Sequence, residues 1–148
     1  MICDITENDM EQILETGKEF WKETYYSQVV KYDEERARDT LLACIHSDSG
    51  IAIWHPESAS FFMGYVTDHW FADMKYAFDF CIWVPKSHRG RGTGYRLLKS
   101  YIDRAKLLGA KEIFLGDIAD IDASTLYRIH EKLGLSYRNK AYSLLVGE

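Results

Sequence analysis

The chain has 148 residues, 47% of them hydrophobic and 14% aromatic, which is enough for one domain with a buried core and excludes a disordered chain. No apolar run approaches the roughly 20 residues of a membrane span, and residues 1–7 lack the features of a signal peptide, so we expect a cytoplasmic protein without a membrane partner. The net charge of -5 argues against a nonspecific nucleic-acid binder.

Two amphipathic helices are predicted in the first third of the chain. Asn8 or Asp9 can cap the first helix, whose apolar stripe extends to Trp21. Asp33 can cap the second helix, whose apolar positions extend to Ile45.

Three strands are predicted next. Ile51–Trp54 and Phe61–Val66 flank a short turn, and the longest strand, Tyr76–Val84, follows a loop at residues 68–75 with exposed aromatic side chains. These strands would form the first part of a central sheet.

The second half of the chain predicts a strand–helix–strand crossover. An apolar stripe ends at Gly109, which can stop a helix, and Glu112–Leu115 is typical of a short buried strand. A last helix ends at Gly134, and residues 135–146 predict two short strands. The fold class is therefore α/β (α+β), a single domain over residues 1–148 with a mixed, mostly antiparallel sheet and helices on both faces.

Charge and cysteine content add further expectations. Residues 1–84 carry 6 Lys/Arg and 16 Asp/Glu, whereas residues 85–148 carry 12 and 7. The basic half would suit a phosphate group and the acidic half a cationic substrate, although ordinary solvated faces give the same pattern. The three cysteines are widely spaced and have no metal-ligand spacing, so we expect reduced thiols and no metal.

The most informative segment is Val84–Tyr95, a basic, glycine-rich turn between a strand and a helix. Gly90, Gly92 and Gly94 would let the backbone approach a ligand, and the N–H groups at a helix start favour an anion. The segment therefore predicts a phosphate cradle; a flexible loop is the alternative. It lacks the Gly-x-Gly-x-x-Gly spacing of dinucleotide-binding oxidoreductases.

Two segments carry a family resemblance. Arg89–Gly94 resembles the Arg/Gln-x-x-Gly-x-Gly/Ala signature of the GNAT acetyltransferases, and His130–Leu135 resembles their Tyr-Glu-Lys-Leu-Gly-Phe. The resemblance is clear over residues 76–138, which it implies to be the core that binds acetyl-coenzyme A. It further implies a primary amine as acceptor, bound mainly by residues 1–75, and a sheet that splays between its fourth and fifth strands.

The resemblance assigns three groups of residues to the coenzyme. Backbone N–H groups of the loop would hold the pyrophosphate with help from the two loop arginines, and the open edge of the preceding strand would pair with pantetheine. Asp122 stands where many relatives carry an Asn that bonds the pantetheine arm, although it can equally be a helix cap. The full set is Ile82, Trp83, Val84, Arg89, Gly90, Arg91, Gly92, Thr93, Gly94 and Asp122.

The catalytic acid and base each have more than one candidate. His130 stands where the family generally has a Tyr acid, and Tyr127 lies three residues earlier on the same helix flank. Asp79 is the candidate base, with Asp117 or a chain of waters as alternatives. Each of these side chains can also have a structural role. We interpret Cys81 as a core residue and not as a nucleophile.

The acceptor site is the least specified part of the sequence. We expect a small-molecule or peptide amine with cationic character, bound by aromatic and acidic side chains. The candidates are Tyr25, Tyr26, Asp68, His69, Trp70, Phe71 and Asp73. A coenzyme-binding module without turnover remains an alternative, a nucleic-acid binder is disfavoured by the acidic total, and pairing of the tail strand across subunits would give a homodimer.

Overall fold

The computed structural model describes residues 1–116, 123–137, 144 and 146 of the chain. Every helix predicted from the sequence is present, as are the predicted strands up to residue 116; the two strands expected in the tail fall largely outside the described residues. A two-residue strand near the N-terminus was not predicted. The elements are β1 (Cys3–Asp4), α1 (Met10–Glu23), α2 (Glu34–His46), β2 (Gly50–His55), β3 (Ser60–Asp68), β4 (Lys75–Trp83), α3 (Thr93–Leu107), β5 (Ala110–Ile113) and α4 (Ala123–Lys132).

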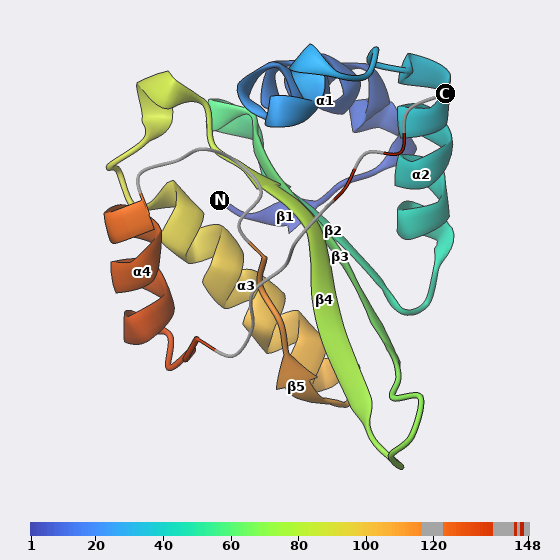
Figure 1. Ribbon diagram of the computed structural model, residues 1–148, viewed down its shortest axis with the longest axis vertical. Helices are drawn as coiled ribbons and strands as arrows, with labels where there is room; N and C mark the ends of the chain where they lie inside the picture. The colour runs from blue at the N-terminus through green and yellow to red at the C-terminus, as the bar shows by residue number, and fades with distance from the viewer. Residues whose placement is uncertain (117–122, 138–143, 145, 147–148) are drawn as a thin grey trace.

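The described strands form one sheet in the order β1-β2-β3-β4-β5. The first three pairings are antiparallel, and the last, between β4 and β5, is parallel. A parallel neighbour requires a crossover, which α3 supplies. The mixed, mostly antiparallel sheet expected from the sequence is thus confirmed (Figure 1).

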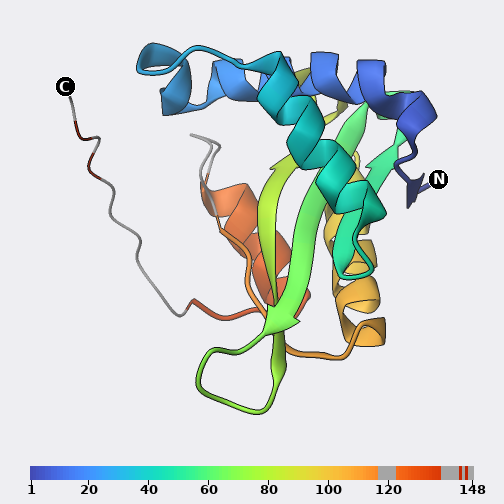
Figure 2. The same ribbon diagram turned by 90° about the vertical axis from the view of Figure 1, so that its right-hand side faces the viewer.

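Helices cover both faces of the sheet. One apolar core joins α1 and α2 to one face, and its buried side chains include Leu41 and Trp83. A second core joins α3 and α4 to the opposite face, where the rings of Phe62 and Tyr101 stack with centroids 4.2 Å apart. Figure 2 shows α1 and α2 across the upper part of their face, with the β3–β4 hairpin extending below them.

Local sequence signals explain where several helices begin and end. The Asp33 carboxylate accepts a hydrogen bond from the Arg36 N–H at 3.0 Å and caps α2 as predicted. Asp9 precedes α1, but its carboxylate accepts from the Thr6 N–H at 2.8 Å, so it stabilises the preceding 3-10 turn instead. Gly109 and Gly134 follow α3 and α4 with φ of 89° and 79°, which explains their role as stops.

A β-bulge interrupts the pairing of β3 with β4. Met63 pairs with Cys81, but the next residue, Gly64, pairs with Asp79, which leaves Phe80 as the extra residue of β4. A Cβ on Gly64 would lie 2.6 Å from the Phe78 carbonyl oxygen, so only glycine fits this close approach. The bulge lies in the part of β4 that faces the candidate site.

Candidate functional site

Strands β4 and β5 separate after a short paired stretch. Their last backbone bond runs from the Phe114 N–H to the Ala77 carbonyl oxygen at 2.8 Å. Beyond it, the Asp79 carboxylate accepts a hydrogen bond from the Gly116 N–H at 2.9 Å. A side chain therefore takes the place of the next ladder contact, and the edge of β4 towards Trp83 is open among the described residues. This confirms the predicted splay (Figure 1).

The loop after β4 has the backbone of an anion cradle. Gly90 and Gly92 adopt φ of 76° and 79°, a region that residues with a Cβ rarely occupy. A Cβ on either glycine would meet no heavy atom within 4 Å. Glycine is therefore required here by the positive φ and not by close packing, and the space next to both residues is open. Gly92 is the N-cap of α3, so the N–H groups of Thr93, Gly94 and Tyr95 have no intrahelical acceptor.

The Arg89 side chain holds this loop to two other elements. Its Nε donates to the Val84 carbonyl oxygen at 2.9 Å, and its Nη2 donates to Glu23 Oε2 at 2.8 Å. Its guanidinium also lies 5.0 Å from the Trp83 ring centroid. Arg89 is thus engaged within the protein, whereas the side chain of Arg91 is exposed at the loop.

Glu23 is a site residue that the sequence analysis missed. It is the last residue of α1, and it also lies 3.5 Å from Lys86 Nζ. A carboxylate at a helix C-terminus is unfavourable to the helix dipole and therefore signals a cation nearby. That signal existed in the sequence, but it did not identify the partner, which lies 66 residues further on.

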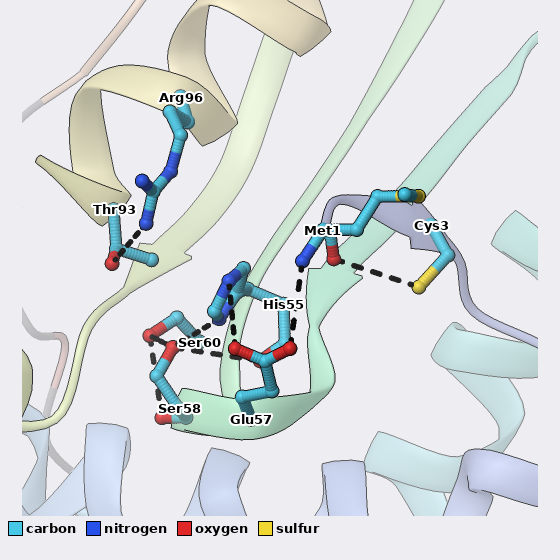
Figure 3. A network of polar contacts seen from close by, with 8 residues as sticks. All are labelled: Met1, Cys3, His55, Glu57, Ser58, Ser60, Thr93 and Arg96. Carbon is cyan, nitrogen blue, oxygen red and sulfur yellow. Dashed lines mark hydrogen bonds and ion pairs between the residues drawn. The ribbon is translucent and has the colours of Figure 1, made fainter.

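A buried polar network lies beside the first turn of α3 (Figure 3). His55 Nδ1 is 2.9 Å from Ser58 Oγ, which is itself 2.8 Å from Ser60 Oγ. On the helix, Arg96 Nη2 donates to Thr93 Oγ1 at 3.2 Å. Burial lowers the pKa of His55, and the nearby Met1 ammonium and Arg96 add to that effect. The network is thus built around a neutral imidazole.

Ile82 and Trp83 are the last residues of β4, and Val84 follows the strand. Ile82 and Val84 pack towards the α3 side, whereas Trp83 packs in the core below α1. The indole Nε1 atoms of Trp83 and Trp21 are buried, and neither has a hydrogen-bond acceptor among the described residues.

The candidate acids lie on α4. Tyr127 is 62% exposed, so it is a surface residue rather than a core aromatic, and His130 is half-buried. The C-terminal end of α4 contacts the first turn of α3, where Lys132 Nζ lies 4.8 Å from the Tyr95 ring centroid. The two candidates are therefore carried by a helix that adjoins the loop. Asp117 and Asp122 lie outside the described residues.

Cys81 does not have the chemistry of a nucleophile. Burial raises the pKa of its thiol, and the negative charge of Asp79 raises it further. The thiol therefore stays protonated at neutral pH, in agreement with a packing role. Within the described part of the chain, no cluster of His, Cys, Asp and Glu is arranged to hold a metal, and no helix is long and apolar enough to cross a membrane.

The residues expected to line an acceptor site fall into two groups. Tyr25 and Tyr26 follow α1 with ring centroids 4.4 Å apart, whereas His69, Trp70 and Phe71 lie in the β3–β4 loop. The two groups are therefore carried by different parts of the chain. Of the acidic candidates, Asp68 is already paired with Lys75 Nζ at 2.8 Å.

Comparison with known proteins agrees with this architecture. A model of the acetyltransferase (GNAT) family matches residues 8–135. A transcriptional regulator from Bacillus halodurans C-125 has a TM-score of 0.77 at 18% sequence identity, over 99% of both chains. An aminoglycoside antibiotic 6'-N-acetyltransferase from Acinetobacter haemolyticus has a TM-score of 0.72 at 14% identity, over 100% of this chain and 99% of that one. No curated protein matches the chain.

A ribosomal-protein-alanine N-acetyltransferase from Brucella melitensis biovar Abortus 2308 is also similar, with a TM-score of 0.72 at 13% identity over 99% of both chains. At such identities these structures share the fold, and their different descriptions leave the acceptor open. The family model is the stronger finding, because it spans the loop, α3 and most of the rest of the chain. The chain therefore belongs to the GNAT acetyltransferase family.

Proposed function

We propose that this protein is an N-acetyltransferase that moves an acetyl group from acetyl-coenzyme A to a primary amine by direct attack in a ternary complex. The observation that carries this proposal is the loop before α3. Two glycines with positive φ precede a helix start whose first N–H groups lack intrahelical acceptors. Membership of the GNAT family supports the same reaction class.

The loop suits the pyrophosphate of the coenzyme. The N–H groups of Thr93 and Gly94 would donate to phosphate oxygens, and the exposed Arg91 would add a charge-assisted bond. We assign the Arg89 side chain to fixing the loop, because its guanidinium already binds Glu23 and Val84.

The open edge of β4 suits the pantetheine arm. Ile82 and Trp83 lie where β4 no longer pairs with β5 in the described part of the chain, so their backbone groups on that side would pair with an extended ligand. Val84 would offer its N–H, since its carbonyl oxygen accepts from Arg89. Asp122 remains a proposed contact of this arm.

Residues around the gap would carry the proton transfers. The bound coenzyme would supply the activated acetyl thioester. Asp79 would accept the proton that the amine loses, with Asp117 or a water chain as the alternative base. His130 or Tyr127 would protonate the sulfur as its bond to the acetyl carbon breaks. The Gly116 N–H bond fixes the Asp79 carboxylate at the gap.

Amine-dependent release of the coenzyme thiol tests the proposal. Asp79→Asn keeps an oxygen for the Gly116 N–H but cannot take up a proton, so we expect kcat to fall by about 10² to 10⁴. We also expect a comparable loss of kcat in either Tyr127→Phe or His130→Ala, whichever of the two removes the catalytic acid. Glu131→Gln, an exposed change on the same helix, is the control and should retain full activity. Unchanged kcat in Asp79→Asn would exclude it as the base.

A coenzyme-binding module without turnover is the second candidate. The observation that favours it is His130, which stands where the family generally has a tyrosine, and one neighbour of the same fold is described as a transcriptional regulator. A protein of this kind would bind acetyl-coenzyme A, release no thiol with any amine of a broad panel, and bind equally well after Tyr127→Phe and His130→Ala together.

A further inference from the structure

A continuous row of aromatic rings lies on the face of the sheet that carries α1 and α2, where Tyr65 packs against the core below these helices. It links β3, β4, the residue after β5 and the β3–β4 loop through ring contacts with centroids 4.2 to 6.2 Å apart. We call it the aromatic surface. Its members are Tyr65, His69, Trp70, Phe71, Tyr76, Phe78, Phe80 and Phe114.

Several of these rings are open to solvent. Phe80 is 39% exposed, Phe114 37%, Phe71 70% and Trp70 86%. Grouped exposed aromatic rings cost solubility and mark binding surfaces more often than scattered ones do. The β3–β4 hairpin that carries much of this surface extends beyond the helices (Figure 2).

The aromatic surface is continuous with the gap of the candidate site. Tyr76 and Phe114 face each other from the two sides of the β4–β5 junction, with ring centroids 5.8 Å apart. Phe114 also makes the last backbone bond before the strands separate. Phe80 is the bulged residue next to Asp79, whose carboxylate spans the gap. A molecule lying on these rings therefore lies at the edge of the gap that the Asp79 carboxylate spans.

The charge of the surface favours a particular kind of amine. Of the two carboxylates at the end of the β3–β4 hairpin, Asp68 is paired with Lys75 at 2.8 Å and Asp73 is exposed, so the surface offers few carboxylates. A polycationic aminosugar needs several carboxylates close together, whereas a single ammonium can be held by ring faces and one carboxylate. The rings of this surface meet edge-to-face or tilted, and a cluster of apolar rings in turn favours an aromatic group over a polar sugar.

We propose that the acceptor is an arylalkyl monoamine, a single primary amine on a short chain joined to an aromatic ring, and that the aromatic surface binds its ring. This inference rests on the proposed acetyltransferase function, because it names the substrate class of the same site. It separates this chain from the aminoglycoside acetyltransferase whose fold it shares.

Calorimetric titration tests the inference without requiring turnover. The full chain, saturated with coenzyme A, is titrated with 2-phenylethylamine, n-hexylamine and kanamycin A. We expect 2-phenylethylamine to bind at least about tenfold more tightly than the other two. Phe80→Ala and Phe71→Ala should each weaken its binding by about three- to tenfold. Leu107→Ala, which removes an 87% exposed side chain at the end of α3, is the matched control and should change nothing.

Each outcome decides the inference. It is overturned if kanamycin A or n-hexylamine binds as tightly as 2-phenylethylamine, if no amine binds, or if both phenylalanine variants bind 2-phenylethylamine as the wild type does. Phe71 lies in an exposed loop, so Phe71→Ala remains informative even if Phe80→Ala fails to fold. Binding of coenzyme A to the same protein samples is measured separately. If the protein does not bind coenzyme A, the proposed function is contradicted. If it binds coenzyme A but shows no preference among the amines, only the proposed substrate class is contradicted.

Discussion

Arg89 Nη2 lies 2.8 Å from Glu23 Oε2, and this ion pair joins the loop before α3 to the last residue of α1. Both side chains are largely shielded, with exposed fractions of 28% and 24%, so water screens the pair less than it screens the surface pairs of the molecule. The helix that begins the chain therefore helps to hold the loop that we assign to the coenzyme.

Glu23→Gln should loosen that loop. The substitution removes the charge that fixes Arg89, so we expect acetyl-coenzyme A to bind about three- to tenfold more weakly in calorimetric titrations, with a loss of about 1 kcal/mol in the free energy of unfolding. The matched control is Glu19→Gln, which breaks an exposed pair with Lys22 on the same helix. Equal coenzyme affinity in both variants would show that the ion pair has no role in the loop.

Alanine substitutions should separate the two kinds of glycine in the loop. Gly92 has φ of 79°, so Gly92→Ala is strained by about 1 kcal/mol and should lower the melting temperature. Gly94 lies in the first turn of α3, and a Cβ there would make ordinary contact with Val84 at 3.7 Å. Gly94→Ala should keep or raise the melting temperature, because alanine favours the helix. The reverse order in thermal unfolding would contradict the described loop conformation.

The buried His55 should make stability depend on pH. Its pKa is lowered in the folded protein, so the unfolded chain binds more protons once the pH falls below about 6.5. The free energy of unfolding should therefore decrease as the pH drops from 7 to 5. In His55→Gln the decrease should be smaller, as measured by urea unfolding at each pH. Identical pH profiles of the two proteins would rule out a neutral, buried His55.

The three thiols should react very differently with iodoacetamide. Cys3 is exposed, whereas Cys44 is buried and burial raises the pKa of both Cys44 and Cys81. At pH 8 we expect mass spectrometry to find one alkylated cysteine in the native protein and three after denaturation. Alkylation of native Cys81 would contradict its assignment as a protonated packing residue.

The sequence predicts the parts of the site that depend on local rules. A glycine at positive φ has few substitutes, so Gly90 and Gly92 are evident from their spacing, and Gly109 and Gly134 mark helix ends for the same reason. The long apolar run of β4 is equally evident. With the two family signatures, these features suffice to predict the family, which the family model confirms, and to propose the loop for the coenzyme.

Features that depend on distant partners could not be predicted. The sequence contains Glu23 and Arg89, but only folding brings them together. The bulge at Phe80 arises from how β3 and β4 pair, and periodicity within one strand does not reveal it. In the sequence, His55 looks like any polar residue that comes after an apolar run. Its burial depends on how β2, its serine partners and α3 pack together, which the sequence does not reveal.

Calorimetric titration with acetyl-coenzyme A tests the central claim most directly. The wild-type protein should bind it with a micromolar Kd, and the double variant Arg89→Ala, Gly92→Glu should lose that binding while circular dichroism shows that it remains folded. Absence of binding by the folded wild-type protein would contradict the assignment of the loop before α3 to the coenzyme.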